Sequence, residues 1–178
     1  AAPGAKLTTA AAGESLRRPL AAGEPAQHWI FVDAQRYEVP PAATLELPEA
    51  TVVGDYAAVI TADGVLDAQN SEYFGIASWR EHPIYLRARL PQPQRVDDCV
   101  AVLAARGGSY NYYHFLLDVL PRFGVLEATR GTHGVDALYV PAATGWQREF
   151  LAMTGLDRYR LIDASKHACV QASTLLVP

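Results

Sequence analysis

The most regular pattern of hydrophobic and polar positions lies between Ser109 and Thr129. At 100° per residue its apolar side chains fill a wide arc, which is typical of a largely buried helix. The arc comprises Phe115, Leu116, Leu117, Val119, Leu120, Phe123 and Leu126. Pro121 cannot donate the hydrogen bond that the Leu117 carbonyl would accept, so we expect a bend or register break between these two residues.

Three ionisable residues interrupt this apolar run at intervals of four: His114, Asp118 and Arg122. In a helix they share one narrow stripe, which Asn111 begins. Charged side chains are rarely buried unless they are paired or functional. One interpretation is an intrahelical ladder that contributes roughly 0.2–0.5 kcal/mol per pair. The other is a set lining a cleft, with Asp118 or His114 as a base and Arg122 as an anion ligand or orienting group.

The chain before this helix predicts short antiparallel strands. Residues 1–27 are rich in Ala, Gly and Pro, so a poorly ordered lead-in is expected there. Runs rich in Val, Ile and Thr, or with alternating apolar residues, then predict strands. These runs are 28–32, 43–47, 51–56, 57–61 and 84–90, with a hairpin turn at Asp63-Gly64. Residues 28–95 are therefore expected to form a β-rich module.

From residue 96 onward the pattern alternates between strands and helices. Apolar runs predict strands over 99–105, 137–141, 158–163 and 173–178, and a second helix over 145–155 ends at Gly155. This alternation indicates a parallel, Rossmann-like layer over 96–178. Gly107 and Gly108 lie between the first strand and the helix, where main-chain amides can bind an anion. The alternative is a tight turn, since neither GxGxxG nor a P-loop is present.

The composition permits a packed soluble chain and limits the candidate partners. Half of the 178 residues are hydrophobic, 19% are charged, and the net charge of −4 gives no reason to expect nucleic acid. Cys99 and Cys169 have no zinc-ligand spacing and are expected to be buried free thiols. Free thiols favour a reducing compartment, so the cytoplasm is expected. No apolar run approaches the ~18 residues of a membrane span.

The segment NYYHFLLDVLPRF resembles a hallmark of glycosyltransferase family 61, which reads roughly N-Y-x-H-[FW]-L-L-D-x-L-P-R. The match covers Asn111, His114, Phe115, Leu116, Leu117, Asp118, Leu120, Pro121 and Arg122. The later segments ALYVP, WQREFLAMTGL and His167 through LLVP extend it, as does the earlier ITADG turn. The resemblance spans about residues 52–178, which would be the first half of the family's domain.

The resemblance implies an α/β chain of the GT-B type, in which two Rossmann-like domains face a cleft. It implies an inverting enzyme that transfers a sugar from a nucleotide-sugar donor to a glycan or other hydroxyl acceptor, in surface polysaccharide synthesis. The donor-binding C-terminal domain of the same chain would be absent from this sequence, and peripheral membrane association is left open. No cofactor is implied, and the lack of a DxD motif argues against metal dependence.

The implied site is built on the helix. Asp118, His114 and Arg122 would be catalytic, with Asp118 the simplest candidate for the base. His114 could be that base or its partner, and Arg122 could orient Asp118 or meet diphosphate charge. Asn111, Gly107, Gly108 and Tyr113 would bind substrate. The alternative is a non-catalytic carbohydrate- or partner-binding domain with a purely structural stripe.

Overall fold

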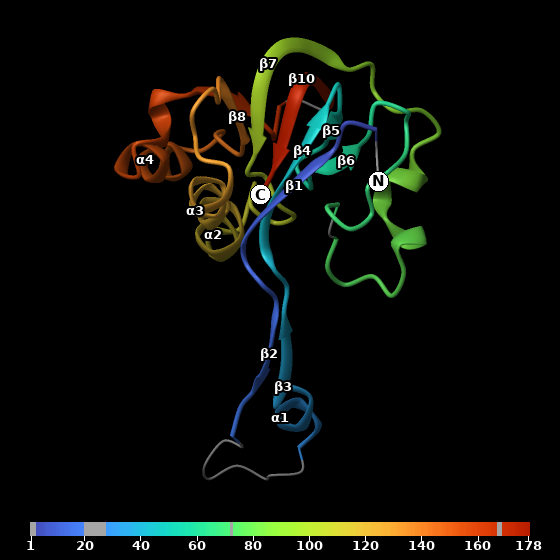
Figure 1. The fold of residues 1–178 in the computed structure, drawn as a ribbon, viewed down its shortest axis with the longest axis vertical. Helices are drawn as coiled ribbons and strands as arrows, with labels where there is room; N and C mark the ends of the chain where they lie inside the picture. The colour runs from blue at the N-terminus through green and yellow to red at the C-terminus, as the bar shows by residue number, and fades with distance from the viewer. Residues whose placement is uncertain (1–2, 20–27, 72, 167–168) are drawn as a thin grey trace.

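The computed structural model describes residues 3–19, 28–71, 73–166 and 169–178, and it shows a mixed α/β chain. An eight-stranded sheet runs in the order β1-β4-β10-β7-β8-β9, with β5 paired to β10 and β6 paired to β5. The strands are β1 (Lys6–Ala11), β4 (Ala42–Pro48), β5 (Thr51–Val53), β6 (Ala58–Ile60), β7 (Gln94–Val102), β8 (Ala137–Val140), β9 (Arg160–Asp163) and β10 (Cys169–Val177). Figure 1 shows β10 and β7 near the centre of this sheet.

The parallel and antiparallel parts of the sheet meet at β10. β10 pairs with β7 in parallel. The pairings of β7 with β8 and of β8 with β9 are also parallel. The other edge of β10 pairs antiparallel with β4 and β5. The strands of 42–60 and of 94–177 thus share one sheet, although the sequence suggested two modules that divide near residue 95. The predicted α/β class is confirmed, and the sheet combines both kinds of strand, with more antiparallel than parallel pairings.

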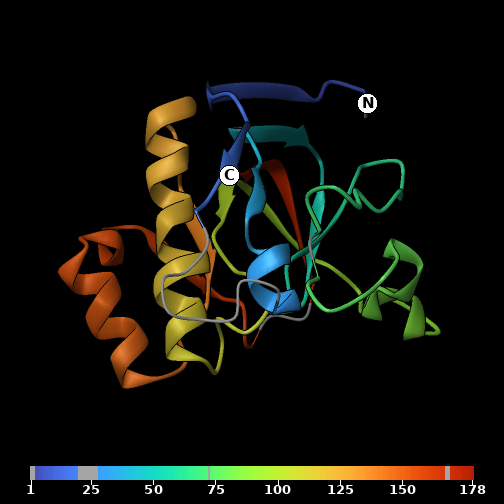
Figure 2. The same ribbon diagram turned by 90° about the horizontal axis from the view of Figure 1, so that it is seen from below.

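Two hydrophobic clusters cover the two faces of the sheet. β7 contributes Val100 and Val102 to one cluster and Ala101 to the other, because successive side chains of a strand point to opposite faces. The first cluster also contains Val52 of β5 and Val59 of β6. The helices of residues 112–129 and 145–153 cover the second cluster, and Figure 2 shows these two helices together on one side of the sheet. The predicted doubly buried strand is therefore confirmed.

The central helix is continuous from residue 112 to residue 129 but changes its hydrogen-bond pattern. It consists of α2 (Tyr112–His114), the π-helical turn η3 (Phe115–Val119) and α3 (Leu120–Thr129). The Leu120 amide donates to the Phe115 carbonyl, five residues back. This turn directly precedes Pro121, so the expected register break is confirmed. The helix is less buried than the apolar arc predicts, since Leu117, a member of that arc, is 54% exposed.

The remaining helices are short. α4 (Gly145–Met153) begins with a capping box between Thr144 and Gln147. The left-handed Gly155 follows it, which confirms the predicted glycine end, and η4 (Leu156–Arg158) leads to β9. No helix in the described part of the chain has the length and apolar character needed to cross a bilayer.

Three local expectations from the sequence are wrong. Residues 28–32 contribute to the helix α1 (Trp29–Asp33) instead of a strand, since a short apolar run does not distinguish the two. Residues 84–90 form no strand: Pro83 starts the 3-10 helix η2 (Pro83–Leu86), which follows η1 (Trp79–Glu81). Only Ile84 of η2 is buried.

The third correction concerns the lead-in. Residues 6–11 form β1 on the edge of β4, and β2 (Glu14–Arg17) pairs with β3 (Arg36–Val39). These strands are ordered by pairing with strands about 20 to 40 residues further along the chain. Local composition does not reveal such pairing. The β2-β3 ribbon carries α1 and extends away from the sheet as an arm (Figure 1). Residues 20–27 and His167 lie outside the described residues.

His82 is buried in an aromatic cluster beside β6. Its ring lies 5.5 Å from that of Tyr56 and 5.4 Å from that of Tyr73, with edge-to-face geometry at both. Nδ1 accepts the Ile84 amide at 3.2 Å, and Nε2 has no hydrogen-bond partner among the described residues. Burial lowers the pKa of His82 below its usual 6.5, because the charged imidazolium loses its hydration.

The depressed pKa of His82 predicts pH-dependent stability. Below pH 6.5 the unfolded chain takes up a proton that the folded chain does not, so the free energy of unfolding falls as the pH drops toward the folded-state pKa. We expect His82→Gln to weaken this acid sensitivity, measured as the shift in urea midpoint between neutral and mildly acidic pH. His28→Gln provides the control, because this histidine is exposed and its replacement leaves the buried His82 in place.

Candidate functional site

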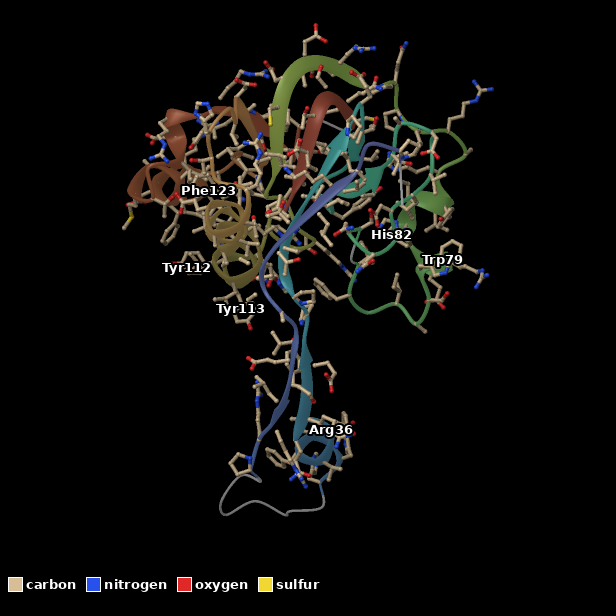
Figure 3. The ribbon with its side chains drawn as sticks, viewed as in Figure 1. Arg36, Trp79, His82, Tyr112, Tyr113 and Phe123 are labelled. Atoms are coloured by element: carbon tan, nitrogen blue, oxygen red, sulfur yellow. The ribbon has the colours of Figure 1, made fainter. Side chains whose placement is uncertain are left out.

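The start of the central helix is fixed by the turn that follows β7. The Gly107 carbonyl accepts the amides of Asn111 at 2.8 Å and Tyr110 at 3.2 Å. The Asn111 side chain then accepts the Tyr113 amide at 2.9 Å, as a helix N-cap does. Asn111 therefore has a structural role at this position. Tyr113 is 63% exposed and, with Tyr112, projects from the lower end of the helix in Figure 3.

His114 and Asp118 form a close side-chain pair on this helix. His114 Nδ1 lies 2.6 Å from Asp118 Oδ2, and the two side chains are 23% and 42% exposed. If Nδ1 carries a proton, it donates to the carboxylate and leaves Nε2 as the basic nitrogen. This is the arrangement in which a carboxylate orients an imidazole for general-base catalysis. The pair is thus partly open to solvent and chemically competent to accept a proton.

Arg122 continues the stripe toward the end of β10. Its Nε donates to the Asp118 main-chain carbonyl at 2.9 Å, and its Nη1 donates to the Pro178 carbonyl at 3.0 Å. The guanidinium therefore connects the helix to the carboxyl end of the central strand. The structure brings all three predicted residues together on one helix, with His114 and Asp118 in direct side-chain contact.

An aromatic stack that the sequence did not reveal covers His114. The Phe74 ring stacks on the imidazole with 5.1 Å between centroids and 24° between planes. The Arg106 guanidinium lies over Phe74 at 4.2 Å and over Tyr73 at 3.8 Å. Its Nη1 is buried without a hydrogen-bond partner among the described residues. Phe74 lies 40 residues before His114, and no periodic pattern in the sequence connects them.

Gly107 and Gly108 allow the turn to approach the helix closely. Gly107 has φ of +85°, and a Cβ there would lie 2.6 Å from Cδ2 of His114. A Cβ at Gly108 would lie 2.5 Å from a methyl carbon of Val119. The Gly108 amide donates to Ala105, and its carbonyl accepts from the fully buried Gln147. These contacts are those of a tight turn, and substrate binding by the two glycines stays a prediction.

A groove of about 640 Å³ opens where β10 ends. Its polar lining includes Arg122 from the central helix and Asp67, Gln69 and Asn70 from the segment after β6. Its apolar lining includes residues of β1, β4 and the end of β10, among them Leu7, Ala43, Leu45, Leu47 and Val177. His114 and Asp118 are not part of this lining; they precede Arg122 on the same helix. The site thus consists of a His-Asp pair next to, rather than inside, a groove.

The groove lies next to the point where the order of the parallel strands reverses, on the side of β10 that pairs with β4. Numbered along the chain, the four parallel strands stand in the order third, second, first, fourth, with β7 first and β10 fourth. The chain after β9 returns past β8 and β7 to form β10. In open α/β sheets, ligands bind outside the carboxyl ends of the strands at such a point. The turn after β7 and the end of β10 both lie at this edge.

Within the described ranges, no three His, Cys, Asp or Glu side chains gather closely enough to hold a metal ion. Cys99 and Cys169 are free thiols, and burial raises the pKa of both.

The chain was compared with known protein families, curated proteins and solved structures. No family, curated protein or solved structure matches it.

Gly108→Ala should destabilise the chain, because its methyl group would overlap Val119 on the helix that carries the site. We expect a loss of about 1–3 kcal/mol in the free energy of unfolding, measured by urea titration. Gly124→Ala is the matched control. Gly124 lies within α3 with open space around a Cβ, so alanine should stabilise the helix by about 0.5–1 kcal/mol. Equal effects at both positions would contradict the packing role of Gly108.

Proposed function

We propose that this chain is the acceptor-side half of an inverting glycosyltransferase. The observation that carries the proposal is the His114–Asp118 pair, with 2.6 Å between Nδ1 and Oδ2, beside a groove at the carboxyl end of β10. Transfer with inversion requires a base for the acceptor hydroxyl proton. The resemblance of 111–122 to the hallmark of glycosyltransferase family 61 supports the same assignment.

The strand order supports a Rossmann-like, GT-B-type half. The order third, second, first, fourth is that of the first four strands in a doubly wound dinucleotide-binding sheet. Such a layer can present its carboxyl edge to a second domain across a cleft. In this proposal the second domain is the C-terminal part of the same protein and binds the nucleotide-sugar, without a metal bridge. The protein would act in the cytoplasm on a glycan or other hydroxyl acceptor.

Within this proposal, the geometry favours His114 as the base and Asp118 as its orienting partner. Asp118 accepts from Nδ1, which leaves Nε2 to take the proton of the acceptor hydroxyl while that oxygen attacks the anomeric carbon. The leaving nucleoside diphosphate carries the displaced electron pair, and a nearby cation would stabilise it. Arg122 lines the groove and is the candidate for this role. Asp118 acting directly as the base remains the alternative assignment.

A non-catalytic carbohydrate- or partner-binding domain is the second candidate function. The bonds of Arg122 favour it, because Nε and Nη1 donate to main-chain carbonyls and connect the helix to the end of β10. An exposed His-Asp pair at i,i+4 is also a common helix feature of small energetic value. In that case the groove binds a ligand and the stripe only maintains the helix.

Asp118→Asn separates the two functions. The substitution preserves the size of the side chain but removes its negative charge. That charge either orients His114 as the base or lets Asp118 act as the base itself. We expect the turnover of the complete gene product to fall by roughly 10²–10⁴, the range that general acid–base catalysis supplies. The melting temperature should change little, because both side chains of the pair are partly exposed. Release of nucleoside diphosphate in the presence of acceptor measures turnover.

Glu127→Gln provides the matched control, since Glu127 is an exposed carboxylate on the same helix and should tolerate the change. His114→Gln should reproduce the loss and remove the corresponding group from the pH–rate profile. Unchanged turnover in Asp118→Asn and His114→Gln would support the binding domain instead. A large fall in melting temperature in Asp118→Asn would assign the pair a structural role.

A further inference from the structure

The arm has an exposed apolar tip. The ribbon of β2 and β3 is a separate two-stranded sheet that extends away from the eight-stranded one, and α1 lies at its far end (Figure 1). No residue of α1 is buried. Trp29 is 66% exposed, and Ile30 and Val32 are each 48% exposed. Tyr37, from the adjoining strand, is 54% exposed. Large apolar side chains thus gather at the distal end of the described part of the arm.

Arginines gather at the same end of the arm. Arg17 and Arg36 are directly opposite each other in the β2-β3 register, and the amide of Arg18 donates to the Gln35 carbonyl just beyond them. Figure 3 shows Arg36 next to α1, at the distal end of the ribbon. Like charges directly opposite in a sheet are destabilising. An anionic surface bound at this position would reduce the repulsion between the two arginines.

The acidic residues of the ribbon are less favourably placed to neutralise these arginines. Glu14 and Glu38 lie at its other end, next to the eight-stranded sheet, and Glu38 accepts the Ser15 hydroxyl at 2.7 Å. Asp33 closes α1. No ion pair between any of these carboxylates and the three arginines occurs among the described residues. Positive charge is thus concentrated beside the apolar tip.

We propose that the tip of the arm docks on an anionic lipid bilayer. Tryptophan, tyrosine and aliphatic side chains enter the boundary between headgroups and acyl chains, whereas arginines bind the anionic headgroups above it. Trp29, Ile30 and Val32 supply the first group, and Arg17, Arg18 and Arg36 supply the second. The arm then holds the chain at a membrane surface without spanning it. This docking does not depend on the proposed glycosyl transfer.

Vesicle flotation tests the proposal with the full 178-residue chain. The chain should float with phosphatidylcholine vesicles that contain phosphatidylglycerol, and much less with phosphatidylcholine alone. Each arginine near an anionic surface contributes about fivefold in partitioning, so Arg17→Gln combined with Arg36→Gln should weaken it about thirtyfold at low salt. Arg87→Gln combined with Arg89→Gln is the matched control, because these exposed arginines lie on the main body.

The apolar contribution has its own pair of variants. Trp29→Ser combined with Ile30→Ser should abolish flotation, whereas Leu86→Ser combined with Leu90→Ser should not, although Leu86 is 85% and Leu90 45% exposed. Lipids brominated on their acyl chains should quench fluorescence in the original chain, and Trp29→Phe should remove this quenching while flotation persists. Circular dichroism should confirm that every variant keeps the fold.

Three outcomes would overturn the proposal. The first is no flotation with anionic vesicles, and the second is flotation that the arm variants and the body variants change equally. The third is a concentration-dependent oligomer, seen by light scattering, that Trp29→Ser with Ile30→Ser dissolves while vesicle binding stays absent. The third outcome would identify a second copy of the chain as the occupant of the tip.

Discussion

The fold depends on the main-chain hydrogen bonds along both edges of β10. One edge pairs with β7 in parallel, with a shift in register between Ala172 and Thr174, and the other edge pairs antiparallel with β4 and β5. Without this strand the β4–β6 segment would have no pairing with the β7–β9 layer. β10 is also where the site is anchored, since Arg122 of the helix donates to the carbonyl of Pro178, directly after the strand.

The same helix is attached to the sheet at its other end. Thr129 and Thr44 share a hydrogen bond of 2.6 Å, and Arg130 lies 3.4 Å from Glu46. Between these attachments, the helix packs four side chains against one face of the sheet: Phe115, Val119, Phe123 and Leu126. The two glycines after β7 allow the first turn of the helix to approach closely. The position of His114 and Asp118 is thus determined by packing on three sides: the turn, the sheet and the Phe74 ring.

Local chemistry explains which parts of this fold could be predicted from the sequence. The doubly buried β7, the glycine end of α4 and the break before Pro121 each depend on residues within a few positions of one another. Short apolar runs gave wrong elements at α1 and η2, because periodicity over so few residues does not distinguish a helix from a strand. The strand β1 was missed because its order comes from its pairing with β4.

The candidate site divides in the same way. The helix geometry made the proximity of His114, Asp118 and Arg122 predictable, since residues four apart share a face. The Phe74 ring and the Arg106 guanidinium were not predictable, because their contacts join segments that no common motif connects. The sequence also suggested anion binding at Gly107 and Gly108, where the structure places close packing against the helix.

The position of β10 in the chain has a consequence for the route by which the protein folds. The Gln171 side chain bonds to the Glu49 carbonyl across a separation of 122 residues, and the neighbouring β10–β4 pairs are equally remote. High contact order slows folding, because the chain entropy of closing long loops is lost before the pairing repays it. During synthesis, β4 and β7 leave the ribosome well before their shared neighbour. Until β10 emerges, each of them keeps an open edge that invites mispairing or chaperone capture.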